Sequence, residues 1–238
     1  NTLYQKCRRT LYVCMRDNYM DCPDRERGQW IGDVSLQIPQ TFYALGRTSD
    51  FLTKKAISDF ILWSKDDVLR GNVPGNHSGE LPSQSLNAIS EYGMIMSYYL
   101  HSGDSSVLYF CYDAIIKYLK LWEMDKNGRL LPRKGSWRWF DHGQNVDDTV
   151  LEFAWYYSAL NSAKKIADII GTDKDIDFLS ERITKISKSF EQFWDGKAYG
   201  SYDLYDDRAN AMSVLSGLAS RDKWNSLSDV LTHVRFSS

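Results

Sequence analysis

A stretch of mixed charge near the amino terminus holds residue types that could perform acid–base chemistry. Residues 16–33 contain five acids, three arginines and one tryptophan. Pro23 favours an extended backbone at the residue before it, and Gly28 and Gly32 add conformational freedom that a helix disfavours. Linkers are usually small and polar, and they rarely contain tryptophan. The sequence therefore predicts an irregular segment that supplies half of an active site built on carboxyl groups.

A second candidate stretch combines aromatic and acidic side chains. Residues 125–145 are predicted to form a long loop that contains Trp137, Trp139, Asp141 and His142. Large aromatic side chains in a glycine-containing loop are poor core candidates, and indole rings can stack against sugars. The two tryptophans could line a sugar pocket or close the mouth of a ring of helices, and the first role is favoured. Asp141 is a candidate sugar ligand, whereas His142 is interpreted as a structural hydrogen bonder.

Composition narrows the class of protein. The chain has 238 residues, is 43% hydrophobic and carries a formal net charge of −2. It can therefore bury one sizeable core, and it offers no electrostatic attraction for nucleic acid or an anionic membrane. No apolar run reaches the ~20 residues needed to span a bilayer. No phosphate loop, metal-ligand spacing or Ser/Cys nucleophile motif is present, so we expect neither a metal nor a cofactor.

Helical periodicity runs along nearly the whole chain, and strand-like alternation is nearly absent. Only residues 197–204 could form a small hairpin. About nine helices are predicted, and they cover approximately residues 2–16, 34–45, 50–63, 84–100, 105–122, 150–170, 173–194, 208–218 and 221–234.

The spacing of the long loops suggests how these helices are arranged. Three conspicuous loops, residues 17–33, 70–82 and 125–145, fall between every second helix. In a ring of helical hairpins, one end has short turns and the other has longer loops that build a site. The pattern favours an all-α protein with an α/α toroid over residues 1–238 as a single domain. Nine helices are fewer than the twelve of a full toroid, so we expect an incomplete ring.

Specific motifs resemble those of a known family. The segment from Asp21 to Asp33 reads DCPDRERGQWIGD and resembles the signature of bacterial α-L-rhamnosidases of glycoside hydrolase family 78. Further matches occur in the order expected for that family, so the resemblance covers almost the whole chain. They are ELPSQSL at residues 80–86, YYLHSGD at 98–104, WFDHGQNVD at 139–147 and DDRANA at 206–211.

The resemblance implies an (α/α)6 barrel that hydrolyses terminal α-L-rhamnosides with inversion, and therefore a rhamnose-containing glycoside or oligosaccharide as its partner. Glu26 matches the family's general acid. Asp21 and Asp33 match positions that hydrogen-bond sugar hydroxyls, and Trp30 matches an aromatic wall beside the sugar. Inverting hydrolysis also requires a second carboxylate, roughly 6.5–9.5 Å from the acid, that activates water.

Simpler readings of single residues stay open. Asp33 could cap a helix that begins near residue 34, and Asp21 could pair with Arg25 or Arg27. Asp207 and Arg208 are expected to form a buried ion pair, and contact with the substrate is the less favoured alternative. For the whole chain, the alternatives are a non-catalytic carbohydrate-binding toroid and a six-hairpin glycosidase that acts on another sugar.

One departure from the family pattern concerns the general base. In the family this base is a glutamate well after the segment that resembles residues 206–211, and no similar motif occurs before Ser238. We therefore expect the chain to be a truncated piece of the barrel whose base lies beyond the C-terminus. Residues 1–238 alone should have little or no turnover. The sequence assigns neither a compartment nor an oligomeric state.

Overall fold

The computed structural model describes residues 2–75, 79–134, 136–143, 145–201 and 205–233. These residues are mainly helical, and strand pairing among them is limited to isolated bridges. None of the helices they form combines the length and apolar character that crossing a membrane requires. The α-helices are α1 (Thr2–Val13), α2 (Ile31–Ala44), α3 (Asp50–Leu62), α4 (Pro82–Ile89), α5 (Met94–Ser102), α6 (Ser106–Lys120), α7 (Asp148–Ile170), α8 (Ile176–Phe190), α9 (Asp207–Leu215) and α10 (Trp224–His233).

The structure confirms the all-α prediction, but it splits one predicted helix and moves the ends of several others by a few residues. The single helix predicted at residues 84–100 is wrong, because α4 ends at Ile89 and α5 begins at Met94. A Cβ at Gly93 would lie 2.0 Å from the carbonyl oxygen of Asn87. Only glycine lets the chain turn so closely against the end of α4. Helix α2 begins at Ile31 rather than near residue 34.

The predicted hairpin at residues 197–204 is present only as a short contact among the described residues. An isolated antiparallel bridge joins Trp194 to Tyr199. Residues 202–204 lie outside the described part of the chain, as does residue 234 at the end of the last predicted helix.

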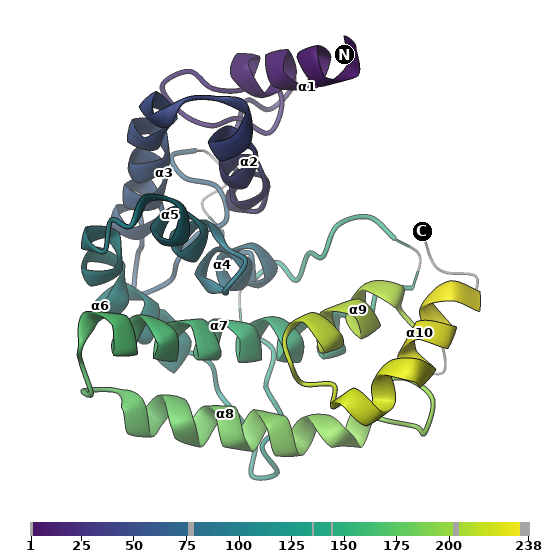
Figure 1. Cartoon of the computed structure of the whole chain (residues 1–238). Helices are drawn as coiled ribbons and strands as arrows, with labels where there is room; N and C mark the ends of the chain where they lie inside the picture. The colour runs from purple at the N-terminus through teal and green to yellow at the C-terminus, as the bar shows by residue number, and fades with distance from the viewer. Residues whose placement is uncertain (1, 76–78, 135, 144, 202–204, 234–238) are drawn as a thin grey trace.

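The helices form two layers. Helices α2, α4, α7 and α9 form a continuous inner row in which each helix packs on the next. The other helices flank this row, with α6 and α8 against α7 and α10 against α9. Figure 1 shows the resulting arc, which runs from α1 at the top, through α3 and α6 at the left, to α8 at the bottom and α10 at the right. The arrangement is that of helical hairpins in an α/α toroid, as predicted.

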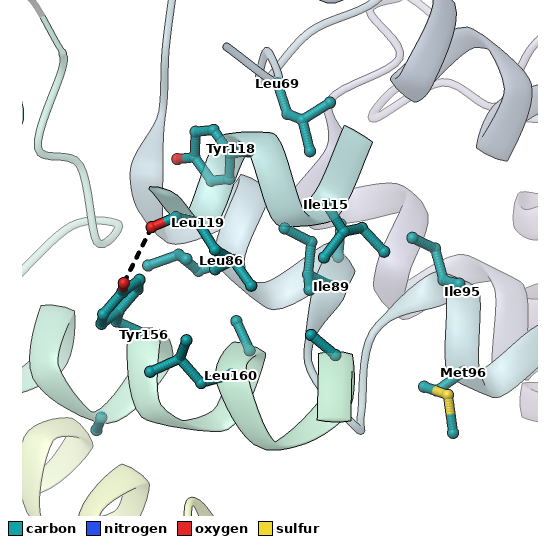
Figure 2. Close-up of a cluster of buried hydrophobic side chains, with 14 of the residues drawn as sticks. Leu69, Leu86, Ile89, Ile95, Met96, Ile115, Tyr118, Leu119, Tyr156 and Leu160 are labelled. Atoms are coloured by element: carbon teal, nitrogen blue, oxygen red, sulfur yellow. Dashed lines mark hydrogen bonds between the residues drawn. The ribbon is translucent and has the colours of Figure 1, made fainter. Parts of the chain in front are cut away.

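A continuous hydrophobic core holds the inner row against its flanking helices. Figure 2 shows Leu86 and Ile89 of α4, Leu119 of α6 and Leu160 of α7 in one cluster. Each such aliphatic side chain contributes about 1.5–3 kcal/mol when it is fully buried. The hydroxyl of Tyr156, which is also buried, donates a hydrogen bond to the carbonyl of Leu119 at 3.0 Å. The inner helices are therefore a packed scaffold for whatever their ends carry.

Candidate active site

A cavity of about 450 Å³ lies where the four inner helices begin. These helices follow one another along the inner row, and their first turns meet at this cavity. The cavity is lined by residues from the first turns of all four inner helices and from the loop before α7. They include Gly32 and Asp33 of α2, Ser83 and Gln84 of α4, Leu151 of α7, Arg208 of α9, and Trp139 and Asp141 of the loop.

The charged segment before α2 is irregular, as predicted, and it closes on itself. The backbone N–H of Asp21 donates to the carbonyl of Gly28 at 2.9 Å, and the N–H of Gly28 donates to the Asp21 carboxylate at 2.9 Å. Between them, Arg27 has a left-handed backbone (φ 52°) and donates from Nε to the carbonyl of Pro23 at 3.0 Å. Asp21 thus serves this loop, and the alternative that it pairs with Arg25 or Arg27 is wrong.

A buried amide fastens this segment to the loop before α4. Gln29 is 2% exposed, and its Nε2 donates to the carbonyl of Val73 at 2.5 Å. Its Oε1 accepts from the backbone N–H of Tyr19 at 3.2 Å. Sequence reasoning missed Gln29, because a glutamine in a charged run gives no signal until its distant partner is known.

Two donors hold the carboxyl group of Glu26. The indole Nε1 of Trp30 donates to Oε2 at 2.7 Å, and a guanidinium nitrogen of Arg25 lies 2.5 Å from Oε1. The Glu26 side chain is 36% exposed. The carboxyl group is therefore oriented by its neighbours while it stays reachable from solvent. Trp30 contacts this acid directly instead of lining the cavity.

Asp33 lies inside the cavity, in the first turn of α2. Burial raises the pKa of the Asp33 carboxyl above its ordinary value. The negative charges of Asp21, Asp141 and Glu26 raise this pKa further. Trp30 occupies the N-cap position of α2, so the alternative that Asp33 caps a helix beginning near residue 34 is wrong. Asp33 thus lies within electrostatic reach of three other predicted site acids, of which Asp141 lines the cavity while Asp21 and Glu26 do not.

The loop before α7 divides its aromatic residues between the cavity and the surface. The rings of Trp137 and Trp139 lie 5.4 Å apart and are tilted by 33°. Trp139 lines the cavity, whereas Trp137 is 54% exposed. His142 makes an edge contact with Trp139, with ring centroids 4.8 Å apart. Of the two tryptophans, Trp139 is the one that a ligand in the cavity would meet.

A buried ion pair anchors the start of this loop. Arg133 donates from Nε and Nη2 to the two carboxylate oxygens of Glu80, at 2.9 and 3.1 Å. The hydroxyl of the fully buried Tyr118 also donates to Glu80, at 3.0 Å. The backbone N–H of Trp137 donates a hydrogen bond to the carbonyl of Glu80, and the Ser83 hydroxyl donates to the carbonyl of Trp139. The aromatic loop is thereby fixed to the beginning of α4.

Arg208 anchors the other end of the same loop. Its Nη1 donates to the carbonyls of Phe140 and His142, at 3.0 and 3.1 Å. The ion pair predicted with Asp207 is wrong, because the guanidinium Nε lies 3.5 Å from Asp206 instead. The motif at residues 206–211 marked this residue, but only the fold shows which carbonyls it reaches.

Two buried aspartates tie the start of α7 to the start of α9. Asp206 is fully buried and accepts the backbone N–H of Asp147 at 2.9 Å. Asp147 caps α7 by accepting from the N–H of Val150 at 3.0 Å, and it also accepts from the N–H of Ser201 at 2.6 Å. The inner helices are therefore joined at the cavity end by side chains as well as by packing.

The buried acid of α7 faces away from this cavity. Glu152 receives two hydrogen bonds from Arg138, at 2.7 and 2.8 Å, and lines a second cavity of about 540 Å³. It is therefore engaged in a structural pair. Across the described part of the chain, no group of three or more His, Cys, Asp or Glu side chains is arranged to hold a metal ion.

Comparison with solved structures identifies the same fold in carbohydrate-active enzymes. The GH78 rhamnosidase of Bacillus sp. GL1 superposes with a TM-score of 0.82 at 19% identity, over 99% of this chain and 26% of that one. The α-L-rhamnosidase of Dictyoglumus thermophilum gives 0.77 at 22% identity, over 97% and 27%. The Streptomyces avermitilis α-L-rhamnosidase, solved with L-rhamnose, gives 0.72 at 19% identity, over 90% and 20%.

This chain thus spans about a quarter of the length of the solved structures it matches most fully. A comparison with curated proteins found no match. The family model of the bacterial α-L-rhamnosidase six-hairpin glycosidase domain matches residues 1–235. Because that match covers nearly the whole sequence, the chain belongs to the bacterial α-L-rhamnosidase six-hairpin glycosidase domain family.

Proposed function

We propose that this domain hydrolyses terminal α-L-rhamnosides with inversion, with Glu26 as the general acid. The observation that supports this role is the carboxyl group of Glu26, which Trp30 holds by a 2.7 Å hydrogen bond and whose charge reaches Asp33 in the cavity. A general acid must be oriented toward the leaving oxygen and accessible to it. Its hydrogen bond to Trp30 and its 36% exposed side chain support this role, since the carboxyl group is held in place and is accessible from solvent.

The remaining residues have roles that follow from their positions. Asp33 and Asp141 line the cavity, where carboxylates can accept hydrogen bonds from sugar hydroxyls. Asp21 lies beside them, but one of its oxygens already serves the loop by accepting from Gly28. Trp139 offers an indole face to the apolar side of the sugar. In this scheme Trp30 orients the acid and Trp137 lies outside the sugar site.

The general base is proposed to come from outside residues 1–238. An inverting enzyme needs a carboxylate that activates water on the opposite face of the sugar. Glu152, the buried acid of the inner helix α7, is occupied by Arg138 and lines the other cavity. A base contributed by a later part of the barrel would complete the pair.

The test uses the full-length parent protein and an aryl α-L-rhamnoside. Glu26→Gln keeps the shape of the side chain and its contact with Trp30 but cannot donate a proton. We expect kcat to fall by roughly 10²–10⁴-fold. Asp24→Asn is the matched control, since Asp24 is an exposed acid of the same loop, and it should retain activity. Activity surviving in Glu26→Gln would remove Glu26 from the role of acid.

Two further measurements separate the parts of the proposal. Proton NMR of the first-formed sugar anomer should show inversion, and retention would exclude the mechanism. Residues 1–238 expressed alone should bind L-rhamnose weakly or not at all and should not turn over substrate. A panel of aryl glycosides tests the two alternatives. Preference for another sugar indicates a different six-hairpin glycosidase, and binding without cleavage indicates a non-catalytic toroid.

A further inference from the structure

Asp141 has an unusual backbone conformation for a residue at the edge of a binding cavity. Its φ angle is 71°, in the left-handed region that residues other than glycine rarely occupy. One carboxylate oxygen, Oδ1, accepts from the backbone N–H of His142 at 2.7 Å. The side chain is exposed, so water competes with this bond. Among the described residues Oδ2 has no hydrogen-bond partner, which leaves it available to a ligand.

Arg208 holds the chain on both sides of Asp141. The same nitrogen, Nη1, donates to the carbonyl of Phe140 and to that of His142. These two carbonyls flank the left-handed residue, so the guanidinium fixes the peptide groups before and after it. Hydrogen bonds from a charged donor are stronger than those between neutral groups. The conformation is therefore held by a group 67 positions further along the sequence.

Groups on helix α9 and on the aromatic loop fix the position of Arg208. Its Nε lies 3.5 Å from the carboxylate of Asp206, which is fully buried at the start of α9. On the loop side, a Cβ at Gly143 would lie 2.3 Å from Nη2. Glycine at that position lets the guanidinium lie directly against the loop backbone. Arg208 thus has one defined site between helix α9 and the aromatic loop.

We propose that Arg208 is a positioning residue that keeps Asp141 in its left-handed conformation and thereby aims the Asp141 carboxylate into the cavity. This inference rests on the proposed function, in which Asp141 accepts a hydrogen bond from the sugar. Arg208 acts here through the loop backbone, and Asp141 makes the contact with the ligand. A displacement of only about 1 Å in such a group can lower the rate by roughly 100-fold.

A first experiment needs no enzyme activity. Hydrogen exchange of the backbone amides in residues 137–143 is measured in the full-length protein and in Arg208→Lys. Lysine keeps the charge, but its single ammonium group cannot reach the two loop carbonyls and the Asp206 carboxylate at once, as Nη1 and Nε of the planar guanidinium do. We expect exchange at the His142 amide to become at least about 10-fold faster as its bond to Asp141 loosens. Arg129→Lys, an exposed arginine in the same connection, is the control and should leave these amides unchanged.

A second experiment is a double-mutant cycle on the hydrolysis of an aryl α-L-rhamnoside. Arg208→Lys and Asp141→Ala are each expected to raise KM, by roughly 10-fold or more. The double variant should be no worse than Asp141→Ala alone, because the arginine would act only through the aspartate. Additive losses would overturn the proposal and indicate that Arg208 touches the sugar itself.

The two experiments fail in different ways. Unchanged exchange at residues 137–143 in Arg208→Lys overturns the positioning role, whatever the enzyme cleaves. Faster exchange in a protein that cleaves no α-L-rhamnoside supports the clamp on the loop and removes the proposed substrate. Adding guanidinium ion to Arg208→Ala provides a rescue experiment. Partial recovery of KM is expected only if loss of the guanidinium group causes the defect.

Discussion

Two loops lead into inner helices that line the cavity, and they are held in different ways. The segment before α2 is closed by bonds among its own residues, the Asp21–Gly28 bonds and the Trp30–Glu26 bond, and Gln29 ties it to the neighbouring loop before α4. The loop before α7 is fastened by residues from distant parts of the chain, chiefly Glu80 and Arg208. The first loop therefore combines bonds within itself with ties to the neighbouring loop, whereas the second is held mainly by side chains distant in the sequence.

The ion pairs of the two loops also differ, in how far their side chains are exposed. The Arg25 and Glu26 side chains are 81% and 36% exposed, whereas those of Arg133 and Glu80 are 15% and 6% exposed. An exposed ion pair contributes about 0–1 kcal/mol to stability, because water and salt screen it. Removing one partner of a buried pair is severe, because the other charge stays buried without compensation. The Arg133–Glu80 pair, which anchors the loop before α7, is therefore expected to contribute more to folding stability than the Arg25–Glu26 pair.

The largest effect is expected for Glu80→Ala. This change leaves the Arg133 guanidinium and the Tyr118 hydroxyl buried without their shared acceptor. The free energy of unfolding should fall by about 3–5 kcal/mol in urea denaturation. Arg25→Ala, which breaks the exposed pair of the other loop, should change it by about 1 kcal/mol or less. Equal losses in the two variants would erase the contrast between the loops.

A smaller effect is expected for Gly28→Ala in the locally held loop. The added Cβ would lie 2.8 Å from Nδ2 of Asn72 and 2.9 Å from the indole nitrogen of Trp30. Such crowding costs about 1–3 kcal/mol of unfolding free energy and displaces the indole that holds Glu26. Gly46→Ala is the control, since a Cβ there meets nothing within 4 Å. A neutral result for Gly28→Ala would mean that the Trp30 contact tolerates displacement.

The smallest effect is a change in the pH dependence of stability at Asp33. Because burial raises its pKa in the folded state, the folded protein binds this proton more tightly than the unfolded chain does. The free energy of unfolding should therefore fall as pH rises from about 3.9, the ordinary aspartate pKa, through the raised pKa. Asp33→Asn should remove this slope and unfold at higher urea at pH 7.

The comparison for that measurement is again Asp24→Asn, because Asp24 is exposed on the same loop. It should leave the slope of stability against pH unchanged. If Asp33→Asn and Asp24→Asn give the same pH profile, the cluster of acids around Asp33 does not penalise its ionised form.

The contrast between the loops also explains what could be predicted from sequence. The signature from Asp21 to Asp33 is closed by bonds between its own residues, so its irregular shape and its acids could be inferred from one contiguous segment. Helical periodicity likewise depends on near neighbours, and it located the inner and flanking helices within a few residues. The break between α4 and α5 was missed because it depends on how closely Gly93 approaches the end of α4.

The residues that sequence reasoning missed or misassigned have partners far along the chain. Gln29 reaches Val73, and Arg208 reaches the carbonyls of Phe140 and His142. Asp33 was open to a capping role only because the start of α2 was placed three residues late. No short-range pattern encodes such contacts, since each is created when two inner helices come together. Nor does any short-range pattern tell Trp139, which lines the cavity, from Trp137, which is exposed.

The convergence of the inner helices has an electrostatic consequence. Each helix presents a partial positive charge at its first turn, and the first turns of α2, α4, α7 and α9 all border the cavity. On their own, the helix dipoles would give the cavity a positive potential, which would repel a developing cation. Glycoside cleavage passes through an oxocarbenium-like state, which is cationic. In the proposed rhamnoside cleavage, the Asp33 and Asp141 carboxylates in the cavity would oppose these dipoles, and the dipoles would in turn offset part of the repulsion between the two carboxylates.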